Sequence, residues 1–386
     1  MVGLSHLFRR SRPGHFLAID LGSDTTIRSF LFKEDGGRRI ALKKWSFDLP
    51  SRKDSFDNIP FIGRYLHALL TACIRQAGSC PKEALIGLGG HLAQNEVETV
   101  NVIRERAGEP IREEELATAL SAFRQQHSER IAGGRRYLLA SVVPLGIQLD
   151  QRPLGTIAPA RRGRVIRIVF FTTYVLDAYW ELLLELRSHW KGLYLTTISD
   201  QAAIAGALIG AVHSHEALLV KVGAKTTEVS IVDHESVLFT GQFPYGGDAV
   251  TLAIARQTGL DQGKSEEIKR RFEQGGLPQK TAEKIREAVQ SASQDWVGAL
   301  RDLLRASGVV IPERIFLFGG GARLETIRAA LTSKIWYHTL PSRGTIDVMM
   351  LGGEAVTGSP FWNKNPFISG PEEVALGALV YRLSNS

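Results

Sequence analysis

Two stretches of the chain repeat one pattern of apolar and polar positions about 200 residues apart. The apolar run Phe16–Ile19 leads into Asp20 and a group of small polar residues, and the β-rich run Ile27–Phe32 follows. Leu218–Val222 leads in the same way into a small polar turn, and Val229–Val232 leaves it. A strand, a turn of small residues and a second strand predict a hairpin. The repetition predicts two lobes of similar design, each with one such loop.

The region between the two repeats predicts further elements. A hairpin is expected over Arg39–Phe47, and apolar residues at helical spacing predict a helix over Ile59–Gln76. Apolar runs and helical spacing then predict a small α+β insertion, with strands over Ala84–Leu88, Tyr137–Pro144 and Arg164–Thr172 and a helix over Arg112–Gln126. Helices are expected over Tyr174–Arg187, Asp200–Val212, Asp248–Gln257 and Glu372–Tyr381, and strands over Gly192–Ile198 and Ile315–Phe318.

Composition narrows the possible partners and the compartment. A chain of 386 residues is too long for one ordinary core, which agrees with two lobes. The net charge of +7 comes from scattered basic residues without an aromatic–basic module, so we expect no nucleic-acid partner. The two cysteines, Cys73 and Cys80, are too few for a disulfide framework and fit a reducing cytoplasm. No apolar run approaches the roughly 20 residues that a membrane-spanning helix needs.

The two predicted turns have the chemistry of a phosphate site. A phosphate is bound by backbone N–H groups, hydroxyls and residues small enough to let it approach. Gly22, Ser23 and Thr25 supply these in the first turn, and Asp20 is placed to hold Mg²⁺ through water. The second turn offers Gly223, Thr226 and Thr227. Taken singly, each turn could be an ordinary hairpin turn.

A third glycine-rich strand end accompanies the two turns. The strand Ile315–Phe318 runs into Gly319-Gly320-Gly321, which leaves the backbone bare enough for a flat base or a ribose to pack against it. The occurrence of all three features in one chain favours an adenine nucleotide held between two lobes.

This ordered set resembles the superfamily of actin, sugar kinases and heat-shock chaperone ATPases, and within it the bacterial cell-division FtsA family. The resemblance runs from about Phe16 to Tyr381 and is carried by Leu85–His91 with Asn101–Arg104, Val142–Asp150 with Pro153-Leu154-Gly155, Phe243–Ala255, Ser265–Lys269, Ile315–Leu324 and Val374–Leu379. It implies an α/β, two-lobed actin-like fold, a duplicated ribonuclease H-like design, with a small α+β inserted subdomain.

The expected organisation has six parts. They are a basic amphipathic tail at 1–13, the first part of lobe I at 14–82, the inserted subdomain at 83–172, the second part of lobe I at 173–212, lobe II with nucleotide-binding elements at 213–365, and a closing helix at 366–386 that returns to lobe I.

The resemblance also implies a set of residues that bind ATP or ADP. The first phosphate loop would comprise Asp20, Gly22, Ser23, Asp24 and Thr25, and the second Lys221, Gly223, Ala224, Thr226 and Thr227. Glu266 and Lys269 would contact the ribose or base, unless they are a surface i,i+3 pair. Gly320, Gly321 and Arg323 would pack on the adenine side, and Gly246 and Gly247 are further cofactor-binding candidates.

One departure from the family pattern changes the expected chemistry. Where the family has an aspartate that opens the second phosphate loop, this chain has Lys221. Lysine cannot coordinate a cation, although it can pair directly with a phosphate, so the expected Mg²⁺ at Asp20 is in doubt and Mg-independent binding is a second hypothesis. Asp200 is the remaining candidate for orienting a catalytic water, although the start of a helix explains it as well. We therefore expect nucleotide binding with at most slow ATP hydrolysis.

The resemblance implies a cytoplasmic scaffold on the inner face of the cell membrane. Such a protein would self-associate into filaments and link a tubulin-like division-ring protein, or other division proteins, to the membrane. Residues 1–12 are basic and amphipathic and could contact anionic lipid in place of that family's C-terminal membrane helix, or form a basic tail. The nearest alternative is PilM, the actin-like platform of type IV pilus assembly, which would bind a short peptide from a membrane partner. A third reading, an active enzyme such as a sugar kinase, is disfavoured by Lys221.

Overall fold

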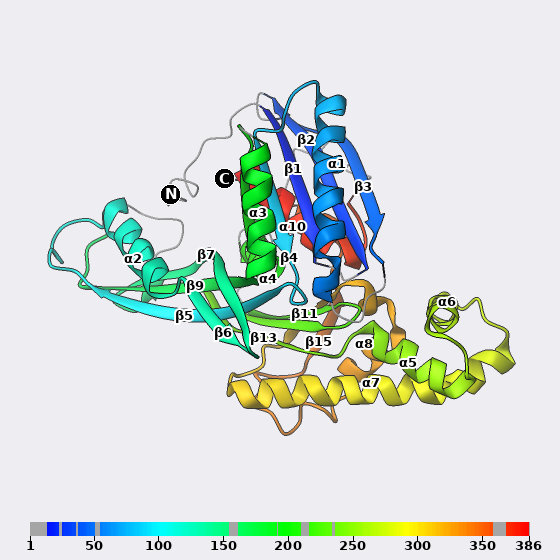
Figure 1. Ribbon diagram of the computed structural model, residues 1–386. Coiled ribbons are helices and arrows are strands. Elements are labelled where there is room, and N and C mark those ends of the chain that lie inside the picture. The colour runs from blue at the N-terminus through cyan, green and yellow to red at the C-terminus, as the bar shows by residue number, and fades with distance from the viewer. Residues whose placement is uncertain are drawn as a thin grey trace.

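A computed structural model describes residues 14–22, 25–35, 38–50, 55–153, 161–190, 192–209, 216–233, 236–357 and 368–385. Three five-stranded sheets organise these residues. One belongs to lobe I, one to lobe II, and the third to an insertion built from residues 93–176. Figure 1 shows the lobe I sheet above the lobe II sheet, with the insertion extending to one side.

The lobe I sheet has the strand order β10-β4-β1-β2-β3. Its strands are β1 (Gly14–Leu21), β2 (Thr26–Asp35), β3 (Arg38–Asp48), β4 (Glu83–Leu88) and β10 (Tyr194–Ser199). The strands β1, β2 and β3 form an antiparallel meander, whereas β4 runs parallel to both β1 and β10. Two helices, α1 (Ile59–Ala77) and α3 (Asp177–His189), cover one face and bury a core that includes Leu66, Leu70 and Leu183.

The lobe II sheet repeats this arrangement. Its order is β13-β12-β11-β14-β15, with β11 (Glu216–Val222), β12 (Thr227–Asp233), β13 (Ser236–Phe243), β14 (Arg314–Phe318) and β15 (Asp347–Met350). The strands β11, β12 and β13 are antiparallel, and β14 is parallel to β11. Its outer face packs against α5 (Gly247–Thr258), α7 (Gln279–Ser307) and α8 (Glu325–Thr332), while α6 (Gln262–Glu273) packs on α5. The duplication predicted from the two hairpins is therefore confirmed.

A layer of two helices separates the two sheets. The helices α4 (Asp200–Ala207) and α10 (Val374–Asn385) pack against each other, and α10 also contacts β1, β2 and β4 and the short helix α9 (Gly353–Val356). Alanines along α4, such as Ala202 and Ala205, let the two helices approach. One continuous apolar cluster joins these helices to Phe30 of lobe I and Leu219 of lobe II. The two lobes therefore share a core.

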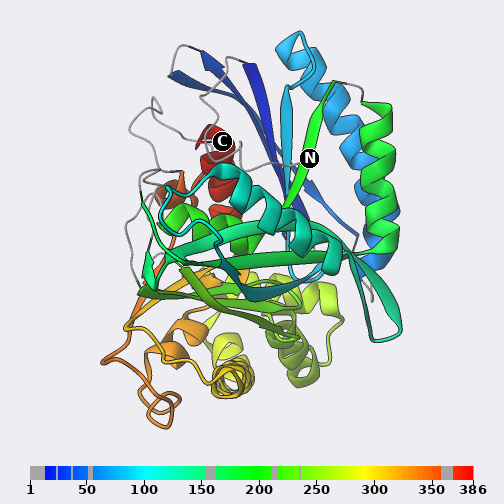
Figure 2. The ribbon, with the colours of Figure 1, turned by 90° about the vertical axis from the view of Figure 1, so that its left-hand side faces the viewer.

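The insertion is an antiparallel sheet with one helix. Its strands are β5 (Ala93–Ile103), β6 (Glu129–Ala132), β7 (Arg135–Leu149), β8 (Arg152–Pro153) and β9 (Val165–Leu176), in the order β5-β9-β7-β6 with β8 paired to β7, and α2 (Glu113–Gln126) covers it. The edge strand β13 of lobe II packs against β5, β7 and β9. Figure 2 shows the insertion lying across the front, between lobe I above and lobe II below.

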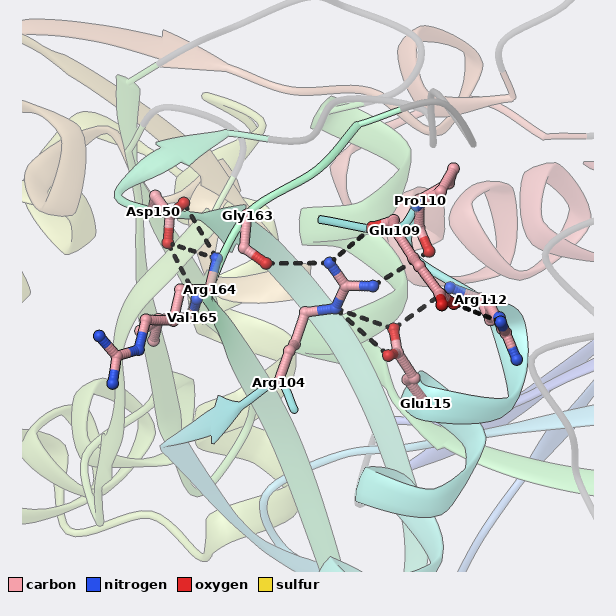
Figure 3. Close-up of polar contacts among 9 residues, drawn as sticks. All are labelled: Arg104, Glu109, Pro110, Arg112, Glu115, Asp150, Gly163, Arg164 and Val165. Carbon is pink, nitrogen blue, oxygen red and sulfur yellow. Dashed lines mark hydrogen bonds and ion pairs between the residues drawn. The ribbon is translucent and has the colours of Figure 1, made fainter. Parts of the chain in front are cut away.

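A buried arginine holds the loops of the insertion together. Arg104, which is 5% exposed, follows β5 and donates hydrogen bonds to the carbonyls of Glu109, Pro110 and Gly163 at 2.9–3.0 Å. Its Nε lies 3.0 Å from Oε2 of Glu115, in the first turn of α2. Figure 3 shows the guanidinium between the segment that leads into α2 and the segment that leads into β9. The planar group thus donates to acceptors from three segments at once.

The structure differs from the sequence-based expectation at several boundaries. The strand expected to open the insertion at residue 83 is β4, and it lies inside the lobe I sheet because it pairs with β1 and β10. The hairpin expected over Arg39–Phe47 is the single strand β3, paired along its length with β2. The predicted helix over Tyr174–Arg187 begins at Asp177 because β9 continues to Leu176. The tail at residues 1–13 lies outside the described residues. Among the described helices, none has both the length and the apolarity that crossing a bilayer requires.

Candidate functional site

The first predicted turn is held by its own aspartate. Asp20 lies one residue before the end of β1 and is 2% exposed, and its Oδ1 accepts a hydrogen bond of 2.7 Å from the backbone N–H of Gly22. Thr25, on the far side of the turn, accepts a backbone hydrogen bond from Leu49. Ser23 and Asp24, both expected to contact phosphate, lie outside the described residues.

The second predicted turn carries an ion pair across its two strands. Lys221 and Glu228 are direct partners in the antiparallel pairing of β11 and β12, so their side chains project from the same face of the sheet. Lys221 Nζ lies 3.0 Å from Glu228 Oε1. The turn between them is closed by a hydrogen bond from the backbone N–H of Gly223 to the carbonyl of Thr226.

Lys221 also pairs with an aspartate of the other lobe. Asp200 begins α4 directly after β10, where Ser199 caps the helix by accepting a hydrogen bond from the N–H of Gln201. Lys221 Nζ donates to Asp200 Oδ2 over 2.6 Å, and the two side chains are 7% and 0% exposed. The ammonium therefore bridges a carboxylate of lobe I and a carboxylate of lobe II.

Gly22 faces this group of charges directly. A Cβ at Gly22 would lie 1.7 Å from Asp200 Oδ2 and 2.7 Å from both Asp20 Oδ1 and Lys221 Nζ. No residue with a side chain fits there, so the glycine is required by the carboxylate and the ammonium that approach it. Asp20, Asp200, Lys221 and Glu228 form what we call the interlobe charge cluster.

Burial and mutual charge shift the ionisation of this cluster. Burial works to lower the pKa of Lys221, but the charges of Asp200, Glu228 and Asp20 outweigh it and raise that pKa. Burial raises the pKa of Glu228, and the charge of Asp200 adds to that rise. Burial, followed by the charge of Asp200, raises the pKa of Asp20 to about 7. Lys221 is therefore charged at neutral pH, and Asp20 exchanges a proton there.

This titration predicts a pH-dependent stability. Because the folded protein binds a proton at Asp20 more readily than the unfolded chain does, the free energy of unfolding should fall as the pH rises from about 4 to about 7. Asp20→Asn keeps the acceptor for Gly22 and removes the charge, so at pH 8 it should be more stable than the wild type, by up to ~4 kcal/mol. Urea unfolding at pH 5 and pH 8 measures this difference.

The matched control is Asp35→Asn. Lys33 lowers the pKa of Asp35 on the surface, so this carboxylate does not titrate within the window. The control should keep the pH slope of the wild type. A wild-type slope that persists in Asp20→Asn would contradict the assignment to Asp20.

The residues expected on the ribose or base side form a second polar cluster. Lys269 Nζ contacts Glu266 Oε2 at 2.6 Å and donates to Thr251 Oγ1 at 3.0 Å and to the carbonyl of Gly247 at 3.2 Å. Thr251 also donates to Glu266 over 2.6 Å. Glu266 and Lys269 thus form an i,i+3 pair that is directed at α5. The lysine side chain is largely buried. Thr251 is a member that sequence reasoning missed.

Several predicted loop residues have structural partners. The carbonyls of Gly223 and Ala224 accept hydrogen bonds from the N–H groups of Gly247 and Asp248, which joins the second turn to the start of α5 beside Gly246. The hydroxyl of Thr227 accepts from the Trp296 indole and donates to the carbonyl of Tyr245. It therefore takes part in the packing of α7 on lobe II.

The triple glycine after β14 fits against the second hairpin. Gly319 has a φ of 91°, which favours glycine, and a Cβ there would lie 2.4 Å from the carbonyl oxygen of Val222. Gly321 packs on the Val222 side chain, whereas a Cβ on Gly320 would meet open space. Arg323 forms a bidentate ion pair with Glu372, at 2.9–3.1 Å, just before α10.

Glu228 was absent from the predicted site, although the sequence holds a signal for it. Opposite charges at the two ends of a tight hairpin predict a cross-strand pair, and Lys221 and Glu228 are placed in this way. Glu228 also borders a polar cavity of about 180 Å³, lined by Gln94, Asn95, Glu96, Arg130, Gln201, Glu228, Thr240, Gly241 and Gln242. The cavity lies where the insertion, β13 and α4 meet.

The nucleoside and phosphate sides of the predicted site fit a nucleotide differently. The backbone at Gly320 is open, and the Glu266–Lys269 cluster offers both signs of charge. On the phosphate side, Asp200 and Lys221 already occupy the space next to Gly22. Mg²⁺ requires oxygen ligands, whereas an ammonium lies among these oxygens. No three acidic, histidine or cysteine side chains of the described ranges are arranged to hold a metal. A metal–phosphate group does not fit the cluster as it is built.

Comparison with known proteins supports the architecture. The family model of the type IV pilus assembly protein PilM matches residues 199–341, which is less than half of the chain. No curated protein sequence matches the chain. The solved PilM–PilN type IV pilus biogenesis complex contains a chain similar to this one, with a TM-score of 0.62 at 16% identity over 95% of this chain and 98% of that chain.

A second solved structure, from another protein, is less similar than the PilM chain. The ethanolamine utilization protein EutJ from Carboxydothermus hydrogenoformans gives a TM-score of 0.49 at 14% identity over 97% of this chain and 92% of that chain. At such identities the similarity concerns the fold alone. With its duplicated sheets, shared helical layer and inserted subdomain, the protein has the two-lobed actin-like ATPase fold.

Proposed function

We propose that this protein is a cytoplasmic actin-like scaffold of type IV pilus assembly, similar in role to PilM. The observation that carries the proposal is the similarity to the PilM chain of the PilM–PilN complex, which extends over 95% of this chain. The PilM family model adds support over residues 199–341, a range that contains the second turn and most of lobe II. The protein partner would then be a PilN-type protein.

The candidate site supports a scaffold in preference to an ATPase. Asp200, the residue expected to orient a catalytic water, cannot accept a proton from a water in an open cleft. Its Oδ2 is bound to Lys221, and the side chain is fully buried. A general base must reach the proton that it removes. Glu266, Lys269, Gly320 and Gly321 lie on the nucleoside side, where the sequence-based prediction of ATP or ADP binding is tested separately from the scaffold role.

The cell-division reading is the second candidate. The motifs of the FtsA resemblance, such as Phe243–Ala255 and Val374–Leu379, belong to a core that both families share, and the comparisons favour PilM. Filaments, a division-ring partner and membrane contact through residues 1–12 would follow from the division role. Filaments of the pure protein on anionic lipid would favour that role.

A binding experiment tests the proposed role. The cytoplasmic segment of a PilN-type protein from the same genome, prepared as a synthetic peptide, should bind the purified full chain in a saturable manner by calorimetry. A scrambled peptide of equal composition is the matched control and should not bind. The tubulin-like division-ring protein should not co-elute with the chain. Binding to that protein without binding to the pilus peptide would refute the pilus proposal.

A further inference from the structure

The interlobe charge cluster joins the two lobes at one buried point, in addition to the apolar core that they share. Lobe I contributes Asp20 and Asp200, and lobe II contributes Lys221 and Glu228. The ammonium of Lys221 lies 2.6 Å from one carboxylate and 3.0 Å from another, and these two belong to different lobes. All four residues are at most 6% exposed.

A second contact closes the lobes next to this point. The N–H of Gly90, in the turn between β4 and β5, donates a hydrogen bond to the Glu228 carboxylate. A Cβ at Gly90 would lie 2.1 Å from Gln242 Oε1 and 3.0 Å from Glu228 Cγ, so this turn of lobe I fits closely against β12 and β13. Glu228 therefore receives a proton donor from lobe I as well as the ammonium of its own lobe.

The balance of charge makes the lysine essential to this arrangement. Three carboxylates and one ammonium meet in a space from which water is largely excluded. Without the ammonium, the carboxylates would repel one another across the two lobes, and their burial would be uncompensated. In the actin-like fold class that the sequence resembles, an aspartate is expected at this position. Here the positive charge is attached to the chain itself.

Lys221 is also poorly placed to bind a phosphate. An ammonium has three hydrogens to donate, and Asp200 and Glu228 each lie within hydrogen-bond distance of it, with Asp20 close by. The face of Gly22, which a phosphate would have to approach, is covered by the same groups. A nucleotide with its metal would have to displace the ion pair before it could bind.

We propose that Lys221 is a built-in counterion that holds the two lobes closed without nucleotide or metal. The two lobes then stay closed in the absence of a metal–phosphate group. This proposal goes beyond the scaffold role and does not depend on which partner the scaffold binds.

Melting of the wild-type protein tests the proposal without any substitution. The melting temperature should be the same in EDTA, in MgCl₂, and in MgCl₂ with ATP or ADP, because a ligand that binds the folded state alone would raise it. Calorimetry should detect no saturable binding of Mg-ATP or Mg-ADP up to ~1 mM, the range in which affinity becomes negligible. Saturable binding of either complex with a rise in melting temperature would overturn the proposal.

Substitution with the residue usual in that fold class gives a second test. Lys221→Asp places four carboxylates together, so the protein should melt at a lower temperature in EDTA and should recover part of the loss in MgCl₂. Lys33→Asp, at an exposed ion pair of lobe I, is the matched control and should not respond to MgCl₂. Lys221→Arg keeps the charge and should remain indifferent to the metal.

Scattering measurements separate closure from stability. The radius of gyration of Lys221→Asp should exceed that of the wild type in EDTA and return toward it in MgCl₂. A variant as compact and as stable as the wild type in EDTA would overturn the role of Lys221. If Lys221→Asp does not fold, the wild-type melting and calorimetry decide the question alone. None of these readouts involves the pilus peptide, so failure here leaves the scaffold proposal standing.

Discussion

Lys221→Met should lower the free energy of unfolding by about 3–5 kcal/mol, the usual effect of removing one partner from a buried ion pair. Methionine has nearly the same volume, so the change removes charge and hydrogen bonds while the packing is kept. Asp200 and Glu228 would then remain buried without the ammonium that they share. Urea unfolding of the full chain at pH 7 measures the loss.

The control for this prediction is Lys33→Met. Lys33 pairs with Asp35 at 2.8 Å, and the two side chains are 39% and 57% exposed, so this loss should be at most ~1 kcal/mol. Equal losses in the two variants would mean that the interlobe pair contributes no more than a surface pair.

Arg104→Ala should be the second most damaging change, and its effect should be confined largely to the insertion. The substitution leaves three carbonyls and the Glu115 carboxylate without their donor, at a cost of roughly 1–3 kcal/mol for each buried group that stays unsatisfied. Because Arg104 connects the segment before α2 to the segment before β9 (Figure 3), these two segments should separate first. Hydrogen exchange should accelerate in residues 104–112 and 161–165 while the lobe sheets keep their protection.

Arg112→Ala is the matched control in the same loop. Arg112 is 55% exposed and pairs with Glu109, so exchange in the insertion should change little. Arg104→Lys should behave more like the alanine variant than like the wild type, because one ammonium cannot reproduce a planar fork of donors. Uniform loss of protection across both lobes would contradict a local role for Arg104.

Much of the fold could be predicted because its signals are local. The two hairpins each occupy about fifteen consecutive residues, and the face formed by Ile62, Leu66 and Leu70 is visible at helical spacing. The errors arise where pairing is decided far along the chain. Strand β4 borders the insertion in sequence, but its partners β1 and β10 lie about 70 and 110 residues away. Nothing local distinguishes such a strand from the first strand of an insertion.

The candidate site could be predicted in part for the same reason. The small polar turns locate the two loops that border the site. The charge cluster between these loops, however, depends on the contact between Asp200 of one lobe and Lys221 of the other. From the sequence alone, a lysine in a strand next to a turn is expected to be exposed to solvent. Its burial is tolerable because carboxylates from β1, α4 and β12 surround it, and that convergence is a property of the fold.

The sequence alone could not separate the cell-division role from the pilus role, for a similar reason. The motifs that resemble the FtsA family are those that build the shared core, including the strand before Gly319 and the closing helix. Partner choice depends on surfaces, and surface residues leave little periodic signal. The match of the PilM family model to residues 199–341 supports the pilus proposal where these motifs do not.

The helical layer between the two sheets has a consequence for the order in which the protein forms. Helix α10 follows lobe II in the chain, and it fills the space beneath β1, β2 and β4, which precede lobe II. Arg39 even donates a hydrogen bond of 2.7 Å to the carbonyl of Ser384, 345 residues later. Lobe I therefore stays incomplete on one face while the whole of lobe II is synthesised, and the nascent chain must keep that apolar face from aggregating until α10 has emerged.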